Sequence, residues 1–355
     1  MSNTQYTVRL AASPDQQKWD TYVASHSAAS PYHLFAWKQA IEEAYGHKSY
    51  YLLAEKDGEV AGVLPIVHFR LPLLLNEFNS LPFCDVGNIL GDNEEVSNLL
   101  FNKCLKLCSE KRIKKIHLRG KISESAGKIT AFTPEHHNKV RMFLDLPESS
   151  EALMKGFKSK LRSQIRKAEK NGLIFSWGSN ADIDGYYAVF SENMRDLGSP
   201  VHSKGWFQSI FKYYADNARM GIVSYKEEIV GGCILLSAGE TIAIPWASTL
   251  RKYNRLAPNM LLYWNVLKYS TDAGFARFDF GRSSEGEGTY KFKKQWGAEP
   301  TPLVWYNYTA SSRPAEKSGN RSGANSKEKI ALMWSKIPTP VANFLGPKIR
   351  KYISL

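Results

Sequence analysis

The sequence feature that most constrains the fold is one order of predicted elements that occurs twice along the chain. Each copy is predicted to form a β-hairpin with a tight turn, a further strand, a helix and a last strand. In the first half, hydrophobic periodicity and turn residues predict strands over 50–55 and 59–70, a strand over 79–90, a helix over 94–111 and a strand over 115–119. In the second half they predict strands over 219–225 and 229–237, a strand over 241–248, a helix over 258–273 and a strand over 277–281. Such a recurring unit in a chain of 355 residues predicts two similar domains that arose by duplication.

The segments outside these copies complete an α+β architecture with mixed central sheets. A short strand is predicted at 6–10, followed by helices over 14–25 and 34–45. Because the chain is long enough for two cores of ordinary size, we expect one domain over 1–149 and a second over 150–310.

The end of the chain differs in composition from both predicted domains. Residues 311–329 contain no apolar side chain larger than alanine, which predicts a flexible linker. Residues 330–355 are apolar with interspersed cations and predict a short amphipathic helical tail, broken near Pro338 and Pro340. This tail either docks on the protein's own surface or lies in an anionic membrane interface.

The second predicted domain begins with a strongly basic amphipathic segment over 150–172. It carries seven cations against two acids: Lys155, Lys158, Lys160, Arg162, Arg166, Lys167 and Lys170 against Glu151 and Glu169. Charge runs of this kind usually form a solvated helix face. The excess of positive charge instead favours contact with phosphate groups or tRNA.

Composition narrows the class of partner and the compartment. The chain has 47 lysines and arginines and 34 acidic residues, a net charge of +13, which favours polyanionic partners or an anionic membrane face. Its four cysteines have no metal-binding spacing, so we expect buried reduced thiols and no metal site. No signal peptide or membrane-length apolar run is recognised, and we therefore predict a cytoplasmic protein, with peripheral attachment to the inner face of the membrane as an alternative.

The stretch 277–297 contains the highest density of side chains suited to binding or catalysis. Phe278 and Phe280 alternate as in a half-buried strand, and a glycine-containing loop and a basic, aromatic run follow. Asp279 either orients a partner or acts as a base, and Arg282 can clamp a carboxylate or phosphate. Lys293 can neutralise developing negative charge. Ser283 and Tyr290 from the same stretch are further candidates for substrate binding. The alternative is structural: Asp279 pairs with a nearby arginine, and the lysines form a solvated face.

Five candidates for substrate binding lie outside this stretch: Arg162 and Arg166 of the basic segment, and His202, Trp246 and Asn259. His202 lines an acceptor cleft or is a satisfied structural histidine, and Trp246 forms a cleft wall or packs in the core. Asn259 follows Pro258 at the start of a helix, where its side chain either contacts a ligand or only stabilises the helix start.

Six runs of the sequence resemble the Fem-type aminoacyltransferases, and in particular the FemAB-like branch associated with exosortase/PEP-CTERM and exopolysaccharide systems. The runs are "HLFAWKQAIEEAYGHKSYYLLAEKDGEVAGVLPI", "SLPFCDVGN", "LRSQIRKAEKNGL", "NMRDLGSPVHSKGWF", "LAPNMLLYWNVLKYSTDAGF" and "FDFGRSSEGEGTYKFKKQWG", in the family's order.

The resemblance implies two GNAT-like (N-acyltransferase) domains packed in tandem. It also implies that Phe292 and Lys293 lie at an aminoacyl donor site, where the lysine stabilises the charge on the leaving ester, and that Arg162 and Arg166 contact phosphate or tRNA.

The function expected from the resemblance is transfer of an acyl or aminoacyl group to an amine or hydroxyl of a cell-envelope or exopolysaccharide precursor. A nucleotide- or lipid-linked saccharide is the expected acceptor. No cofactor is expected to bind tightly, and the donor, aminoacyl-tRNA or acyl-CoA, acts as co-substrate. The alternatives are a CoA-dependent N-acyltransferase and a non-catalytic, anion- or membrane-binding accessory of an envelope system.

Overall fold

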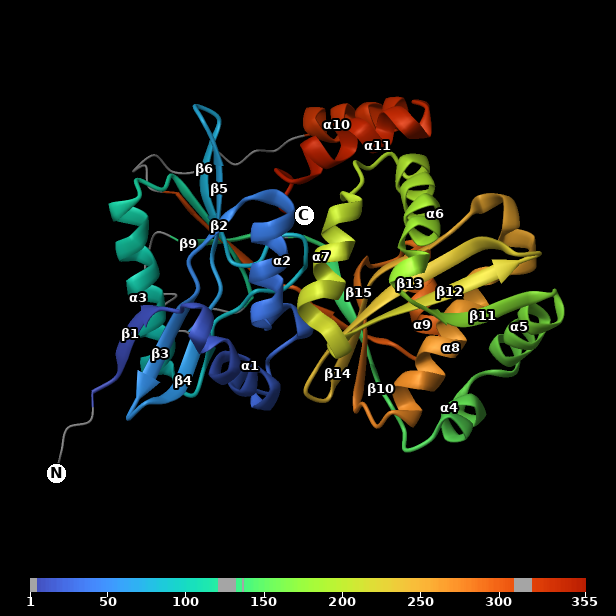
Figure 1. The fold of residues 1–355 in the computed structure, drawn as a ribbon, viewed down its shortest axis with the longest axis horizontal. Helices are drawn as coiled ribbons and strands as arrows, with labels where there is room; N and C mark the ends of the chain where they lie inside the picture. The colour runs from blue at the N-terminus through green and yellow to red at the C-terminus, as the bar shows by residue number, and fades with distance from the viewer. Residues whose placement is uncertain (1–4, 121–131, 136, 310–320) are drawn as a thin grey trace. The chain divides into compact units, whose positions relative to one another are not determined.

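The computed structural model describes residues 5–120, 132–135, 137–309 and 321–355 (Figure 1). The chain forms two compact units. Unit 1 comprises Met1–Lys139, Pro302–Lys317 and Ser354–Leu355, and unit 2 comprises Val140–Thr301 and Ser318–Ile353. The chain thus enters unit 2 before residue 150, and residues after Thr301 return to unit 1 inside the segment predicted as the second domain.

Unit 1 is built on two sheets. Its helices and strands are β1 (Thr7–Leu10), α1 (Gln16–Ser25), α2 (Phe35–Tyr45), β2 (Lys48–Ser49), β3 (Leu52–Lys56), β4 (Glu59–Leu64), β5 (Val67–Leu71), β6 (Leu75–Asn79), β7 (Leu90–Gly91), α3 (Glu94–Glu110), β8 (Lys115–Arg119), β9 (Phe132–Glu135) and β17 (Trp305–Thr309). The strand orders are β1-β3-β4-β7 and β2-β5-β6-β8-β17-β9. Helix α3 packs its apolar stripe, which includes Val96, Leu100 and Cys104, into the core of this unit.

Two strand predictions in unit 1 are wrong, and a proline explains each. The strand predicted over 59–70 is broken after Leu64, where Pro65 interrupts the chain and β5 continues in the other sheet. Strand β6 ends at Asn79, the residue at which the strand predicted over 79–90 was expected to begin. Pro82 has no backbone N–H to donate to a neighbouring strand, and Phe83 has a φ of 70°. An extended strand therefore cannot continue through these two residues.

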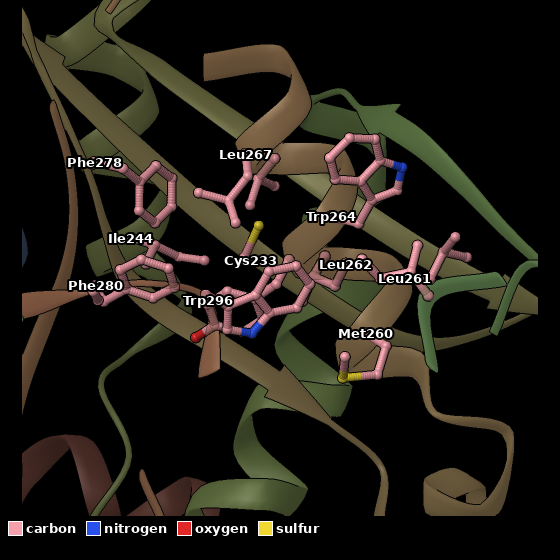
Figure 2. Close-up of a cluster of buried hydrophobic side chains, with 14 of the residues drawn as sticks. Cys233, Ile244, Met260, Leu261, Leu262, Trp264, Leu267, Phe278, Phe280 and Trp296 are labelled. Carbon is pink, nitrogen blue, oxygen red and sulfur yellow. The ribbon is translucent and has the colours of Figure 1, made fainter. Parts of the chain in front are cut away.

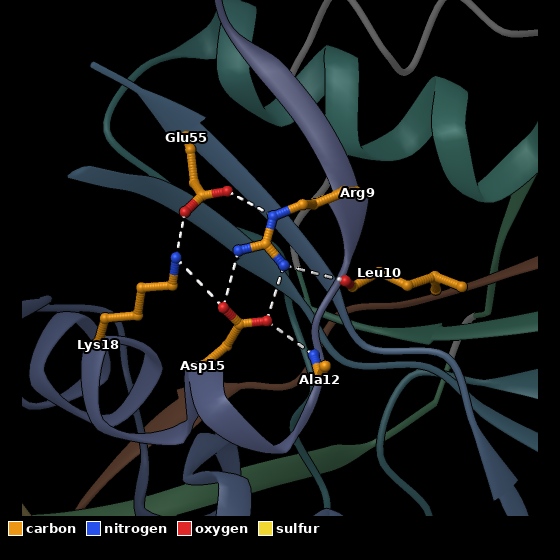
Figure 3. Close-up of polar contacts among 6 residues, drawn as sticks. All are labelled: Arg9, Leu10, Ala12, Asp15, Lys18 and Glu55. Carbon is orange, nitrogen blue, oxygen red and sulfur yellow. Dashed lines mark hydrogen bonds and ion pairs between the residues drawn. The ribbon is translucent and has the colours of Figure 1, made fainter. Parts of the chain in front are cut away.

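A network of four charged side chains ties the start of unit 1 together (Figure 3). The Arg9 guanidinium donates to both Asp15 carboxylate oxygens at 2.7 Å and to Glu55 at 2.7 Å, and Lys18 pairs with both acids. The hydrogen bonds from Arg9 hold the pKa of Asp15 well below its usual range. The network therefore joins β1, the turn before α1, α1 and β3 by side chains that remain charged.

Unit 2 is built on one mixed sheet in the order β11-β12-β13-β14-β15-β10-β16. Its elements are β10 (Lys139–Asp145), α4 (Ser150–Gly156), α5 (Ser159–Lys170), β11 (Leu173–Gly178), α6 (Ile183–Asp196), α7 (Lys204–Tyr214), β12 (Ala218–Tyr225), β13 (Glu228–Ala238), β14 (Thr241–Thr249), α8 (Pro258–Asp272), β15 (Arg277–Ser284), α9 (Gly288–Gln295), β16 (Glu299–Pro302), α10 (Arg321–Trp334) and α11 (Thr339–Arg350).

The predicted duplication appears as the same parallel pairing in both units. In unit 1, β6 pairs with β8 over Glu77–Asn79, and α3 precedes β8. In unit 2, β14 pairs with β15 over Thr241–Ala243, with α8 between the two strands. Both units therefore contain a strand, a crossover helix and a parallel strand after their hairpin.

The core of unit 2 lies between the sheet and helix α8 (Figure 2). Phe278 and Phe280 of β15 are fully or almost fully buried, and Tyr263 of α8 stacks on Phe280 with ring centroids 5.7 Å apart. The apolar residues of the basic segment 150–172 recur at helical spacing, but the structure divides the segment into α4 and α5, with α4 ending at Gly156. At the division, Phe157 packs edge-on against Trp296 with ring centroids 5.4 Å apart.

The C-terminal helices belong to unit 2. A flexible linker is predicted at 311–329, and residues 311–320 of it lie outside the described residues. For residues 321–329 the prediction is wrong, because they form part of helix α10. Helix α11 docks on unit 2: Ala342 and Gly346 are buried, and Asn343 donates to Ser191 of α6 at 3.2 Å. Within the described residues, no helix is long and apolar enough to cross a membrane.

Candidate functional site

The two central parallel strands of unit 2 separate soon after they pair. β14 and β15 are in register only from Thr241 opposite Arg277 to Ala243 opposite Asp279. The next residues of β14 include Pro245, which has no backbone N–H to donate, and the β13–β14 register shifts at this level. The sheet is therefore interrupted between the C-terminal parts of β14 and β15, beside the predicted site stretch.

The same irregularity redirects the side chains of β14. Ile244 packs in the core on the α8 side, whereas Trp246, two residues later, faces the aromatic side chains of α7. Regular alternation would place both on one face, so the bulge moves Trp246 to the other. Trp246 is buried, with its ring centroid 5.3 Å from Phe207 and 6.3 Å from His202.

Asp279 lies at the last paired position of β15 and is fully buried. Arg141 of the adjacent strand β10 donates to one carboxylate oxygen through Nε at 2.8 Å and through a second guanidinium nitrogen. The other carboxylate oxygen accepts from the backbone N–H of Gly281 at 2.8 Å. Asp279 is thus held by a buried cation and a backbone donor, which suits a residue that orients its neighbours.

Lys293 closes the turn between β15 and α9. Its ammonium donates to the carbonyl oxygens of Gly281 at 3.2 Å and Arg282 at 2.7 Å, and its side chain is nearly buried. Gly281 has a φ of 72°, a conformation that favours glycine and turns the strand toward these contacts. We call the group Arg141, Asp279, Gly281, Arg282, Ser283 and Lys293 the β15–α9 corner.

Ser283 adds a buried hydroxyl to the corner. Its side chain is almost fully buried, and its Oγ has no hydrogen-bond partner within the part of the chain that the structure describes. Buried hydroxyls are normally bonded, so this oxygen is available to a ligand or water. Phe292 and Tyr290 of α9 instead pack against the core, Phe292 edge-on to Tyr263 at 4.9 Å.

His202 lies in the aromatic cluster of unit 2 rather than on its surface. Its ring stacks on Trp206 with centroids 5.5 Å apart, and only 2% of the residue is exposed. Burial, and next the charge of Arg350 in α11, hold the pKa of His202 well below its usual range. The imidazole is therefore neutral, and its surroundings match the structural interpretation more closely than a solvent-facing cleft.

The remaining predicted residues, Asn259, Arg162 and Arg166, come from other elements than the corner. Asn259 is exposed at the start of α8, and Arg162 and Arg166 are on α5. Among the described residues, no hydrogen bond or ion pair joins either arginine to an acid or to the corner. The corner thus gathers Asp279, Arg282, Ser283 and Lys293, while Trp246 and His202 share a separate cluster.

Sequence reasoning missed Arg141 and the helix α9. Arg141 is separated from Asp279 by 138 residues. The structural alternative in the sequence analysis instead pairs Asp279 with an arginine that is close in the sequence. An arginine inside the apolar run "KVRMFLD" was the available signal of a buried cation. The basic, aromatic run after the glycine-containing loop was assigned no secondary structure, and it forms helix α9, which carries Lys293. Within the described residues, no group of three or more His, Cys, Asp or Glu side chains is placed to hold a metal ion.

Comparisons with known proteins identify the fold. Residues 155–294 match the family model of the acetyltransferase (GNAT) domain. The chain consists of two tandem GNAT-like domains. FemX is similar with a TM-score of 0.70 at 15% identity, covering 85% of this chain and 97% of that chain. A tandem GNAT protein from the clavulanic acid biosynthesis pathway has a TM-score of 0.53 at 10% identity, covering 88% and 100%. L-PGS from Bacillus licheniformis has a TM-score of 0.56 at 12% identity, covering 93% and 99%.

The sequence matches no curated protein. The predicted α+β fold with tandem GNAT-like domains is confirmed, and the domain match together with the Fem-like fold supports an acyltransferase. The matched segment contains β14, α8, β15 and Lys293, so the interrupted sheet and most of the β15–α9 corner belong to the GNAT domain.

Proposed function

We propose that unit 2 transfers an acyl or aminoacyl group from an activated donor to an amine or hydroxyl of a cell-envelope precursor. The observation that carries this proposal is the separation of β14 and β15 beside the ammonium of Lys293. A gap between parallel strands suits an extended, amide-containing donor arm, because such an arm can bond to strand backbone groups. Amine attack on an activated ester builds negative charge on oxygen, which a fixed ammonium stabilises.

Lys293, Arg282 and Ser283 are the residues that we propose to contact the donor. Asp279 then acts as a positioning residue through Arg141 and Gly281, since its carboxylate is buried and already bonded. Phe292 supports α9 from the core side. The attacking amine loses its proton to solvent or substrate, so no protein base is required at this site.

The donor is either an acyl-CoA or an aminoacyl-tRNA. The match to an acetyltransferase domain favours the CoA ester. The similarity in fold to FemX and the cations of α5, Lys160, Arg162, Arg166, Lys167 and Lys170, favour the aminoacyl donor. We propose Arg162 and Arg166 as phosphate contacts for either donor, and a nucleotide- or lipid-linked saccharide of an envelope or exopolysaccharide pathway as acceptor.

A transfer assay tests the proposal directly. The full chain is incubated with radiolabelled acetyl-CoA, a longer acyl-CoA or aminoacyl-tRNA, together with a nucleotide-linked amino sugar or a lipid extract. We expect one donor class to give enzyme-dependent label in the acceptor fraction. Saturable acceptor binding with no transfer from any donor would instead support the non-catalytic accessory function.

A peripheral membrane contact through α10 and α11 is a second part of the proposal. One face of α11 docks on unit 2, while Phe344 is 65% exposed and Met333 of α10 is 72% exposed. The Lys348 ammonium lies 3.6 Å from the centroid of the Phe344 ring, so the exposed apolar side chains are accompanied by cations. This pattern fits an anionic lipid surface.

Vesicle binding tests this contact. Replacing Phe344 and Met333 with serine removes exposed apolar area and is expected to reduce co-sedimentation with vesicles that contain phosphatidylglycerol by roughly fivefold or more. The matched control makes the same replacement at Ile174, which is 67% exposed on β11. This control is expected to change co-sedimentation little. Equal co-sedimentation of all variants, or none with the unchanged chain, would exclude lipid contact through this face.

A further inference from the structure

Unit 1 contains a basic cavity that the transfer reaction does not use. Its volume is about 690 Å³, within the range of small-molecule sites. It lies among the end of α2, β2, β5, β6 and the turn after α3, and its charged and titratable lining is Lys48, Arg70, Lys111, Arg112, His47 and His68. No aspartate or glutamate lines it.

The four permanent cations of this cavity have no acidic partner in the part of the chain that the structure describes. Within the described residues, no carboxylate forms an ion pair with Lys48, Arg70, Lys111 or Arg112. Nearby cations do have such partners, for example Lys115 with Glu77 at 3.8 Å. The ammonium groups of Lys48 and Lys111 each lie 5.5 Å from the centroid of the same Tyr50 ring. Both ammonium groups therefore lie near one ring of the cavity lining, and like charges gathered in one cavity repel one another unless an anion binds among them.

The buried side of the cavity is ordered by hydrogen bonds. Asn76 donates through Nδ2 to the carbonyl oxygen of Arg112 at 2.7 Å, which turns its Oδ1 toward Nε2 of His68, also at 2.7 Å. His68 therefore carries its proton on Nε2, and Nδ1 takes the second proton when the ring ionises. Burial, and then the charges of Arg70, Lys111 and Lys48, lower the pKa of His68. An anion among these cations would reverse the electrostatic part of that shift.

The negative ends of the neighbouring helix dipoles do not neutralise the four cations of the cavity. α2 ends at Tyr45 and α3 ends at Glu110, so two helix C-termini adjoin the cavity. Each C-terminus carries about half a negative charge, or about one charge together, against four cations. About three positive charges therefore remain without compensation. The four cations are themselves exposed to solvent, but they differ from a flat basic face because they surround a concave volume that is also lined by the buried, hydrogen-bonded His68.

We propose that this cavity binds the phosphate or diphosphate group of a phosphate ester, held by Lys48, Arg70, Lys111 and Arg112. Two to four negative charges match the uncompensated cations, and guanidinium groups bind phosphate oxygens bidentately. The source of the group is a soluble nucleotide or a lipid headgroup, which share this chemistry. The proposal does not rest on the proposed transfer reaction, since every residue of the cavity belongs to unit 1 and the β15–α9 corner belongs to unit 2.

Calorimetric titration of the full chain with inorganic pyrophosphate tests the site. We expect saturable one-to-one binding, weakened by salt. The double variant Arg70→Gln/Lys111→Gln is expected to weaken binding by roughly tenfold or more, because two charge-assisted contacts are lost. The matched control Lys106→Gln/Lys114→Gln removes two exposed cations of α3 and the following turn that do not line the cavity, and less than about twofold weakening is expected.

A second readout follows His68 by NMR. Pyrophosphate is expected to raise the pKa of His68 in the unchanged chain and in the control variant, but not in Arg70→Gln/Lys111→Gln. All four substituted side chains are exposed, so the variants are expected to fold, and circular dichroism checks this. Equal weakening in both double variants, absence of pyrophosphate binding at low salt, or binding that leaves His68 unchanged would overturn the proposal.

Competition experiments distinguish the sources of the phosphate group. Displacement of pyrophosphate by ADP at lower concentration than inorganic phosphate assigns a nucleotide. Displacement by vesicles containing phosphatidic acid, but not by ADP, assigns a lipid headgroup. Displacement by tRNA that is equally strong in the cavity and control variants would show a non-specific polyanion surface and would overturn the proposal.

Discussion

Replacing Arg141 with methionine is expected to lower the free energy of unfolding of unit 2 by about 3–5 kcal/mol. The reason is the environment of Asp279, whose carboxylate is fully buried and loses its cation partner in this variant. An uncompensated buried charge must either stay desolvated or take up a proton, and both outcomes cost stability. Urea unfolding, followed by tryptophan fluorescence, measures the change.

Two further variants show that the cost comes from the unpaired charge. Arg277→Met, on β15, removes a cation that pairs with Asp145 at 3.2 Å on the surface, and the expected loss is below about 1 kcal/mol. Arg141→Met/Asp279→Leu removes both buried charges and is expected to recover much of the lost stability. If Arg141→Met costs no more than Arg277→Met, Asp279 is not held in the way described.

Replacing Lys293 with alanine is expected to reduce kcat for the transfer reaction by about 10²–10³-fold. The variant removes the ammonium that lies at the carbonyls of Gly281 and Arg282, beside the proposed donor site. The matched control is Lys294→Ala on the same helix, whose side chain pairs with Glu299 on the surface at 2.8 Å. Its removal is expected to change kcat less than about twofold. Steady-state kinetics with the donor identified by the transfer assay measures both.

A structural role for Lys293 predicts a different result. If the ammonium stabilises developing charge, the loss of rate is larger for donors with poorer leaving groups, and Lys293→Arg recovers part of it. If the lysine only closes the β15–α9 turn, the loss is the same for every leaving group and follows the loss of thermal stability. A rate for Lys293→Ala equal to that of Lys294→Ala would remove the lysine from the reaction.

The sequence predicted those elements whose signals are local. The helices at 34–45 and 94–111 and the second hairpin follow from hydrophobic period and turn residues, and the structure has them within one or two residues at α2 and α3. The residue chemistry of the stretch 277–297 named Asp279, Arg282 and Lys293, and the family resemblance also named Lys293. The structure places these three residues of one stretch at the same corner. Their roles in catalysis and binding remain predictions.

Contacts between distant residues were beyond the sequence. The partner of Asp279 comes from β10, and a pattern read along the chain contains no information on which strand lies beside β15. The break after α4 and the redirection of Trp246 lie beside Gly156 and Pro245, which are local signals, but the contacts that Phe157 makes with Trp296 and Trp246 with Phe207 depend on the fold. The basic cavity of unit 1 combines cations from β2, β5 and the turn after α3, which are scattered in the sequence.

The sequence by itself therefore determined most of the order of the elements, the duplication and the stretch that we propose as the reactive site, because periodicity, turn residues and motifs are properties of neighbouring residues. Only the tertiary structure decided which charges are paired. Asp279 is neutralised by Arg141, whereas Lys48, Arg70, Lys111 and Arg112 have no acidic partner among the described residues. Charge pairing depends on distances of a few ångströms between side chains far apart in the chain, and folding sets those distances.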